Sequence, residues 1–292
     1  MQIVKASDIE WRGASNHRGE GLYFKYLLEG EENTLENYCL TMGKIEMREG
    51  TEFTRYSPRH KHNFDQLRFA VKGRMCIGKN KYLESGQIGY FAEGTPYGPL
   101  EKFDVNQLGL VLQFGGASRQ GFISTRQARE GRERLRPFGE FRDGIFFRTS
   151  GQGRKNQDGF EAIWELVNGR KLQYPKPRYQ EPIILTPGNF DWNPTSTPGV
   201  ERKLLGTFTE RGTRLEFFRL DKGASWTDTD EPAIRISFVT SGEGTFNGKP
   251  FEQYSALEAK AGEAPVFKAS SETEIFRMVL PLLAQAGIAK AA

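Results

Sequence analysis

Short runs of alternating apolar and polar residues recur along the chain. In residues 67–72 and again in 234–239, an apolar side chain stands at every second position. Side chains two residues apart in a strand point to the same face, so both runs predict antiparallel strands with one buried face. In the first run that face would carry Leu67, Phe69 and Val71. The 33 glycines and 14 prolines are scattered between such runs, as in a protein of many short strands joined by turns.

The strands and turns form a weak internal repeat. Four turn residues have counterparts about 169 residues later, the pairs being Gly73 and Gly242, Gly78 and Gly248, Gly94 and Gly262, and Pro96 and Pro265. Two all-β units related by duplication are typical of the sandwich or barrel class. We therefore expect one β unit in residues 1–115 and a second in residues 191–292.

Residues 116–190, between the two copies, follow a different pattern. In residues 158–169 the apolar positions fall at i, i+3, i+4 and i+7, which predicts an amphipathic helix. Asp158 would cap its N-terminus and Gly169 would end it. We interpret the charged stretch 126–136 as a solvated face. The segment is thus expected to be an insert with one packed helix that bridges the two β units.

Composition narrows the class of protein. Of 292 residues, 41 are basic and 37 acidic, and the net charge of +4 is too small to indicate binding to nucleic acid. No apolar run reaches the length of a membrane span, and the N-terminus has no apolar signal core or cleavage pattern. Cys39 and Cys76 stand in strand-like contexts, where we expect reduced core thiols. These features predict a cytoplasmic protein that binds neither nucleic acid nor a membrane.

Two of the three histidines, His60 and His62, stand one residue apart. In a strand their side chains would point the same way. Neutral imidazole is the commonest protein ligand of first-row metals, so the pair would supply two neighbouring coordination positions. The alternative is a surface His-Lys-His turn that binds nothing. On the pair alone the two interpretations are level, and the residues that follow it favour a metal.

Those residues resemble the first motif of the cupin family. His60 and His62 match its His-x-His element, and Gly73 matches its final glycine. Two positions depart from the motif: Gln66 stands where the family has Glu, and Thr54 stands where it has its leading glycine.

The second cupin motif is matched in part. Pro96 and Gly98 agree with its Pro-x-Gly element, whereas Glu101 occupies its histidine position and Gly89 is one residue out of step. The resemblance covers roughly residues 37–114 and, more weakly, 204–281. It implies a bicupin, with two cupin-type β-barrels (the double-stranded β-helix, or jelly roll) and a partly helical insert between them.

The resemblance also implies a metal site in the first barrel, formed by His60, His62, Gln66 and Glu101. Two imidazoles and one carboxylate suit Fe(II) best, with Mn, Ni or Zn as alternatives. Gln66 would be a weak fourth ligand or a hydrogen-bonding group. The alternative to a ligand role for Glu101 is a position at the rim, where it would form an ion pair with Lys102 or Arg68. Asp65 is a rival carboxylate, but its position in the strand points it away from the histidines.

The expected partner of this site is a small molecule. Tyr56 and Tyr97 would donate hydrogen bonds to it. Arg59 or Arg68 would hold a substrate carboxylate, although Arg59 faces away from the histidines on strand parity and Arg68 points inward only if Leu67 points outward.

The second barrel is expected to be structural, or to form the wall of a pocket. No histidine follows His62, so it lacks imidazole ligands. Its Asp228, Asp230 and Glu231 are interpreted as acidic turn residues before a strand, with a hard-cation site as the alternative.

Three functions fit these patterns. The first is a metal-dependent dioxygenase acting on a small aromatic or keto-containing molecule, as the resemblance to quercetinase-like bicupins implies. The second is a metal-dependent lyase or isomerase, with Glu101 as the general base. The third is a non-catalytic small-molecule-binding or structural bicupin with a degenerate metal site. The resemblance further implies a homodimer, since cupins often pair through sheet edges.

Overall fold

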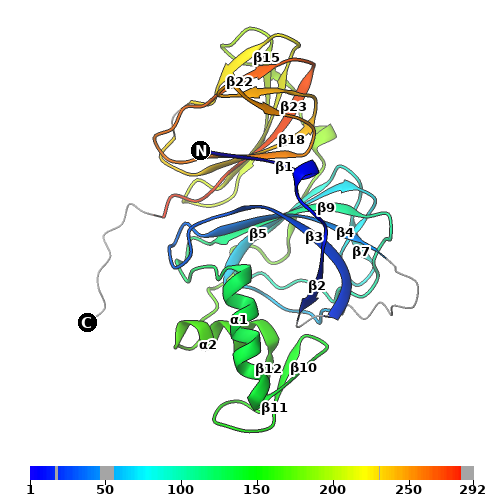
Figure 1. Cartoon of the computed structure of the whole chain (residues 1–292), viewed down its shortest axis with the longest axis vertical. Helices are drawn as coiled ribbons and strands as arrows, with labels where there is room; N and C mark the ends of the chain where they lie inside the picture. The colour runs from blue at the N-terminus through cyan, green and yellow to red at the C-terminus, as the bar shows by residue number, and fades with distance from the viewer. Residues whose placement is uncertain (17–18, 47–55, 230, 284–292) are drawn as a thin grey trace. The chain divides into compact units, whose positions relative to one another are not determined.

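The computed structural model describes residues 1–16, 19–46, 56–229 and 231–283 (Figure 1). These residues are mostly β-strand, with two α-helices. The chain divides into an N-terminal unit, Trp11–Leu185, and a C-terminal unit made of Met1–Glu10 together with Thr186–Ala292. No helix in the described part of the chain is long and apolar enough to cross a membrane.

The N-terminal unit is built on a seven-stranded antiparallel sheet in the order β13-β8-β5-β9-β4-β3-β2. In that order the strands are Ile183–Leu185, Ile88–Phe91, Phe64–Lys72, Leu108–Gly115, Tyr38–Ile45, Gly19–Glu29 and Arg12–Asn16. A hairpin of β6 (Met75–Gly78) and β7 (Lys81–Leu83) accompanies them, as do the bridges Ser57 to Leu100 and His60 to Tyr97. Together they form the first β-barrel.

The C-terminal unit repeats this arrangement. Its seven-stranded sheet has the order β1-β21-β18-β23-β16-β15-β14, whose strands are Gln2–Lys5, Ser255–Ala259, Arg235–Ser241, Thr273–Val279, Arg214–Leu220, Val200–Thr207 and Asn193–Pro194. A second sheet contains β17 (Ser225–Thr227), β22 (Val266–Ala269), β19 (Gly244–Phe246) and β20 (Lys249–Phe251). Strand for strand, β5 of the first barrel therefore corresponds to β18 of the second.

The register of the strands agrees with the repeat seen in the sequence. The pairing of β5 with β9 shifts after Ala70, and the pairing of β18 with β23 shifts after Val239, about 169 residues later. With this register, Arg235 of β18 takes the place of Gln66 of β5. Residues of the two barrels can thus be compared position by position.

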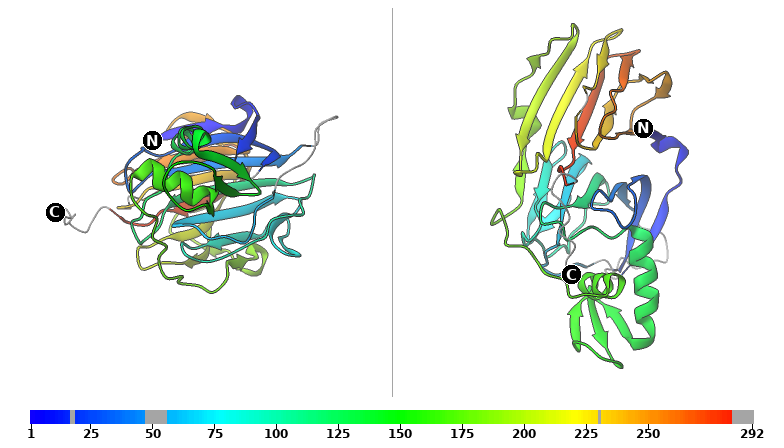
Figure 2. Two further views of the ribbon diagram at one scale, coloured as in Figure 1. Left: turned by 90° about the horizontal axis from the view of Figure 1, so that it is seen from below. Right: turned by 90° about the vertical axis from the view of Figure 1, so that its left-hand side faces the viewer.

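The edge strands of the two sheets come from unexpected parts of the chain. The first ten residues, which we expected in the N-terminal β unit, belong to the C-terminal unit, because Gln2–Lys5 pair with β21 (Figure 2). Conversely, Ile183–Leu185 from the end of the expected insert pair with β8 of the first barrel. Backbone pairing across such sequence distances leaves no local signal in the amino-acid pattern.

Strand β5 is buried on both faces, which corrects the expectation of one buried face. Leu67 and Phe69 are buried as predicted. However, it is Ala70, on the opposite face, that packs into the apolar cluster of the barrel with Phe91 and Tyr97. An alternating pattern cannot tell which face is the interior when both faces are covered.

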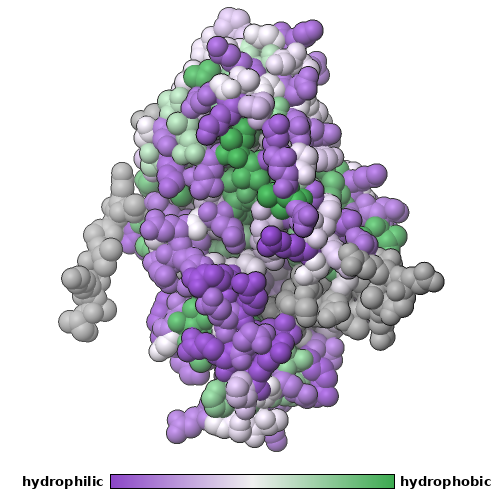
Figure 3. Space-filling view, in the orientation of Figure 1, coloured by the Kyte–Doolittle hydropathy of each residue, from purple (hydrophilic) through white to green (hydrophobic). Residues whose placement is uncertain are grey.

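The insert contains the predicted helix and a second one. Helix α2 (Gly159–Asn168) is capped by the Asp158 carboxylate and ends at Gly169, whose φ of 64° is left-handed. Helix α1 (Thr125–Leu135) was not predicted, because its exposed arginines hide a narrow apolar stripe; the surface over α1 is strongly hydrophilic in Figure 3. A capping box of Ser124 and Gln127 starts it.

The two helices pack against the first barrel. The shared apolar cluster contains Phe64 of β5, Leu135 of α1, and Phe160 and Trp164 of α2. A short antiparallel sheet of β10 (Gly139–Arg142), β11 (Ile145–Arg148) and β12 (Asn156–Asp158) connects the helices, with a 3-10 turn at Arg136–Phe138. Both cysteines, Cys39 and Cys76, are buried and free, as expected.

Candidate functional site

His60 and His62 lie side by side just before β5. The backbone of His60 pairs with Tyr97 through hydrogen bonds of 3.0 and 2.9 Å, and the carbonyl of His62 accepts from Gly94 N–H at 2.8 Å. Their ring centroids are 4.9 Å apart with an interplanar angle of 78°. Both residues are half-buried. The expectation that the two side chains lie together is therefore met.

The surroundings of each ring fix its orientation. His60 Nδ1 lies 2.6 Å from the Pro58 carbonyl oxygen, which can only accept, so Nδ1 carries the proton and Nε2 has a lone pair. His62 stacks on Phe64 at 4.4 Å and meets the edge of Phe160, from helix α2, at 5.3 Å. The insert thus helps to position a histidine of the barrel, which no sequence pattern indicated.

The hydroxyl of Tyr97 joins His62 to two further residues. It lies 3.0 Å from His62 Nε2, accepts a hydrogen bond of 2.9 Å from Arg68 Nη2, and lies 3.4 Å from Gln66 Oε1. Arg68 Nε also donates to Gln66 Oε1 at 2.6 Å. We call these five residues, His60, His62, Gln66, Arg68 and Tyr97, the histidine cluster.

Gln66 and Arg68 contact each other on β5. The amide oxygen of Gln66 accepts a hydrogen bond from Arg68, as a hydrogen-bonding group would, and its role as a ligand stays a prediction. The Arg68 side chain lies on the interior face of β5, with its guanidinium carbon 4.8 Å from the Phe91 ring centroid and 4.9 Å from that of Tyr97. Arg59 is exposed.

Two predicted site residues are not joined to the cluster. Glu101 is exposed, and within the described ranges it forms no ion pair, neither with Lys102 nor with Arg68. Tyr56 is half-buried and makes no hydrogen bond or ring contact with a histidine. Among the residues described, no three His, Cys, Asp or Glu side chains form a group that could hold a metal ion. Thr54 lies outside the described residues, and the role of Glu101 as a ligand stays a prediction.

Asp65 lies apart from the histidine cluster. Its carboxylate accepts from Tyr90 Oη at 2.8 Å and from Glu93 N–H at 2.9 Å. Burial raises the pKa of Asp65 to about 7, against the lowering effect of these hydrogen bonds and of Arg178. Glu93, itself buried, pairs with Arg178 at 2.8 Å. Both carboxylates therefore have local partners.

The donor atoms of the cluster fit a metal in part. Two oriented imidazoles suit a first-row transition metal. The other oxygens, from Gln66 and Tyr97, are neutral, and the Arg68 guanidinium adds a positive charge nearby. The histidine cluster thus offers two good ligands and brings no carboxylate of its own.

The corresponding region of the second barrel holds a different set of residues. Asp228 takes the place of His60, because its N–H bonds the Pro265 carbonyl at 2.8 Å as that of His60 bonds Tyr97. Asp228 is only 1% exposed and lies 2.6 Å from Arg277 and 3.1 Å from Arg235.

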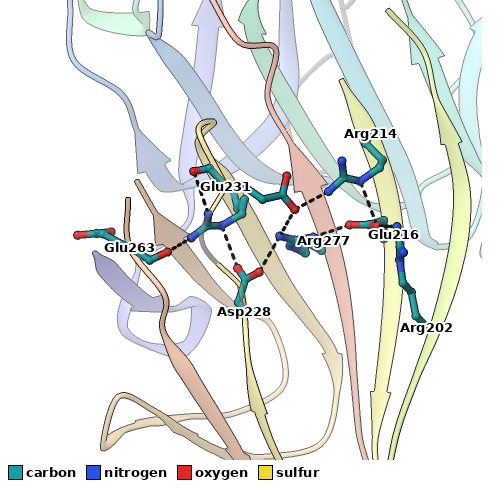
Figure 4. A network of polar contacts seen from close by, with 8 residues as sticks. Arg202, Arg214, Glu216, Asp228, Glu231, Glu263 and Arg277 are labelled. Carbon is teal, nitrogen blue, oxygen red and sulfur yellow. Dashed lines mark hydrogen bonds and ion pairs between the residues drawn. The ribbon is translucent and has the colours of Figure 1, made fainter. Parts of the chain in front are cut away.

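Further ion pairs surround these residues (Figure 4). Arg277 also contacts Glu216 at 2.6 Å and Glu231 at 2.8 Å, and Arg214 contacts the same two carboxylates at 3.1 and 2.5 Å. We call this set, Arg214, Glu216, Asp228, Glu231, Arg235 and Arg277, the arginine network.

The arginine network corrects the interpretation of the acidic residues before β18. Asp228 is a buried ion-pair partner and not a solvated turn residue, and Glu231 is paired with two arginines. Asp230 lies outside the described residues. Carboxylates neutralised by arginines in this way are poor ligands for a hard cation.

Comparison with known proteins rests on structure. No family model matches the chain, and no curated protein matches it at a significant level. The chain is similar to a candidate dioxygenase from Nostoc punctiforme PCC 73102, with a TM-score of 0.60 and 10% identity over 98% of this chain and 84% of that one.

Two further structures have the same fold. Bacillus subtilis oxalate decarboxylase, described with Mn(II) centres, matches with a TM-score of 0.55 and 11% identity over 96% of this chain and 77% of that one. Streptomyces albus HEPD, with 2-hydroxyethylphosphonate and Fe(II) bound, matches with a TM-score of 0.56 and 10% identity over 96% and 76%. At such identities the likeness shows the fold alone: an all-β, cupin-type barrel fold, as the motifs implied.

Proposed function

We propose that the first barrel is the active site of a metal-dependent enzyme. His60 and His62 would hold a divalent transition metal, with Fe(II) first and Mn, Ni or Zn as alternatives. The observation that carries this proposal is the pair of rings 4.9 Å apart, one with its Nδ1 proton fixed on the Pro58 carbonyl. A fixed tautomer and ring orientation is the usual arrangement of metal-binding histidines.

The reaction we place first is an oxygenation of a small aromatic or keto-containing molecule. A bound metal would supply the redox chemistry that couples such a substrate to oxygen. The similarity in fold to a candidate dioxygenase and to HEPD with Fe(II) bound supports this order. The apolar rings of Phe64, Phe91 and Phe160 lie around the cluster and would limit the access of water.

Within the cluster, Tyr97 would handle a proton. Its hydroxyl accepts from Arg68, so its own proton is directed to His62 Nε2 or Gln66 Oε1. When His62 Nε2 is engaged as a ligand, the proton has Gln66 or a substrate oxygen as its acceptor. Tyr97 is thus proposed as a hydrogen-bond donor to substrate.

A lyase or isomerase is the second candidate for the same metal framework. It would need Glu101 as general base, and the exposed Glu101 makes no hydrogen bond with the cluster in the described residues. We therefore place it after the oxygenase. A non-catalytic binding barrel is the remaining alternative, favoured by the positive charge of Arg68 beside the histidines.

Elemental analysis of the purified full-length protein tests the proposal. We expect close to one equivalent of metal in the wild type and in His17→Ala, which changes the histidine outside the motif, and none in His60→Ala/His62→Ala. Glu101→Gln would lose metal only if Glu101 is a third ligand. Oxygen uptake with aromatic and keto substrates then tests the reaction class. Wild type that stays metal-free after reconstitution would favour the binding barrel.

A further inference from the structure

The half-buried Arg68 differs from three other arginines of this protein in the kind of partner it has. Arg178 pairs with Glu93, Arg235 with Asp228, and Arg277 with three carboxylates. Within the described ranges, Arg68 makes no ion pair, and both groups that it bonds, Gln66 Oε1 and Tyr97 Oη, are neutral. A guanidinium keeps its charge in proteins, so a partly desolvated one is best stabilised by an anion.

The hydrogen bonds of Arg68 leave one edge of its guanidinium for such an anion. Nε donates to Gln66 and Nη2 donates to Tyr97, so both hydrogen bonds are made by the guanidinium edge that consists of Nε and Nη2. At the opposite edge, Nη1 makes no hydrogen bond with a described residue, and Nη2 keeps its second N–H group, because its bond to Tyr97 lies on the side of Gln66 Oε1, 3.4 Å from the Tyr97 hydroxyl. Two parallel N–H donors at this edge match the two oxygens of a carboxylate.

Arg68 is also held in place before any ligand arrives. Its guanidinium carbon lies 4.8 Å from the Phe91 centroid and 4.9 Å from that of Tyr97, and its two hydrogen bonds fix the plane. An arginine that is already ordered loses little side-chain entropy on binding. These contacts are those of a preformed anion anchor.

The anchor lies next to the histidines. The Tyr97 hydroxyl bonds both Arg68 Nη2, at 2.9 Å, and His62 Nε2, at 3.0 Å. A molecule held by Arg68 would therefore have its neighbouring atoms close to the imidazoles. It would also bring the negatively charged oxygen that the cluster itself does not supply.

We propose that the small molecule taken by the histidine cluster is a carboxylic acid, bound through its carboxylate to Arg68. This inference deepens the proposed function, because it names the class of substrate for the same site. A charge-assisted bidentate pair is expected to favour the acid over its neutral amide by about 10- to 100-fold in affinity. Arg68 is then the residue that sets the charge of the substrate.

Calorimetric titration of the metal-free full-length protein tests the proposal, in chloride-free buffer. The probes are acetate, pyruvate and benzoate, each against its amide. We expect at least one acid to bind at least about tenfold more tightly than its amide, a preference that falls below about threefold in Arg68→Gln and is partly kept in Arg68→Lys. Arg219→Gln, which changes an arginine paired with Glu201 in the second barrel, is the matched control and should behave as wild type.

Two results would overturn the inference: no acid preferred over its amide, or a preference that survives in Arg68→Gln. The readout is separate from metal content. If the wild type holds no metal but its carboxylate preference depends on Arg68, the metal proposal fails and the anion anchor stands. If the metal depends on the histidines and the preference is absent, the anion anchor alone fails.

Discussion

In corresponding regions, around β5 and β18, the two barrels differ in what surrounds their positive charges. In the first, the guanidinium of Arg68 bonds the neutral oxygens of Gln66 and Tyr97. In the second, Arg277 forms ion pairs with three buried or partly buried carboxylates. Arg235, at the position of Gln66, is completely buried and forms an ion pair with Asp228. One barrel keeps an uncompensated charge beside two imidazoles, whereas the other neutralises its charges internally.

The difference shows how duplicated barrels can divide their roles. A network in which every charge has a partner stabilises its own fold and leaves nothing for a ligand to compensate. A cluster with an unpaired charge lowers the stability of the ligand-free protein and raises its affinity for a ligand of opposite charge. Functional sites commonly have this property. On this view, removing the arginine from each barrel should have very different effects on stability.

Removing Arg277 should have the largest effect. Arg277→Met leaves Glu216 and Asp228 buried with fewer positive partners, and we expect the free energy of unfolding of the C-terminal unit to fall by about 3–5 kcal/mol. Arg68→Met leaves no carboxylate behind, so the N-terminal unit should change by less than about 1 kcal/mol. Hydrogen exchange in β16, β18 and β23 against β5 and β9 measures both. Equal losses in the free energy of unfolding of the two units would contradict the expected difference between the barrels.

The pH dependence of the N-terminal unit sharpens the comparison. Burial raises the pKa of Asp65 to about 7 from its ordinary 3.8, so the folded unit holds a proton that the unfolded chain releases. Its stability should be greatest below about pH 4, fall by roughly 2–4 kcal/mol as the pH rises to 7, and then stay level.

Asp65→Asn isolates this contribution. Tyr90 and the Glu93 N–H donate to different oxygens of Asp65, so the amide keeps an oxygen acceptor for one of them and places an NH2 group beside the other, and it cannot ionise. The decline in stability between pH 4 and 7 should disappear from the N-terminal unit, with the C-terminal unit of the same sample as an internal control. A decline that persists in the variant would assign it to other groups, with Glu93 and Arg178 the first to examine.

Removing one hydroxyl from the histidine cluster should have a smaller effect. Tyr97→Phe loses the oxygen that joins His62 to Arg68, and we expect metal affinity to weaken by about tenfold, as for other groups that orient a ligand. Tyr82→Phe is the matched control, because Tyr82 packs on the same apolar cluster and its hydroxyl makes no hydrogen bond with a described residue. Competition with a chelator of known affinity measures the change. The same affinity in both variants would show that Tyr97 does not position the ligand.

Local patterns in the sequence were sufficient for part of this account. The spacing of His60 and His62 placed both rings together, and Asp158 and Gly169 marked the ends of α2. The repeated glycines gave the register that relates the barrels. Each of these inferences depends on residues close together in the chain, where backbone geometry alone fixes the outcome.

Other features depended on residues far apart in the sequence. The sequence around Asp228 indicates a turn residue, because its ion-pair partner Arg277 lies 49 positions away in the chain. Leu67 and Phe69 of β5 are buried as predicted, but the alternating pattern did not show that the opposite face, with Ala70, is buried as well. Helix α1 was missed because its arginines dominate the pattern. Tertiary contacts of this kind leave no periodic signal.

The number of metal ions bound per chain tests the central claim, that the first barrel alone carries a ligand site. Metal-free protein would be titrated with Co(II) and followed by its visible absorption. We predict one equivalent for the wild type, one for Glu231→Gln in the arginine network, and none for His60→Ala/His62→Ala. If the histidine variant still bound one equivalent of Co(II) and Glu231→Gln bound none, the metal site would lie in the second barrel, which would contradict the account.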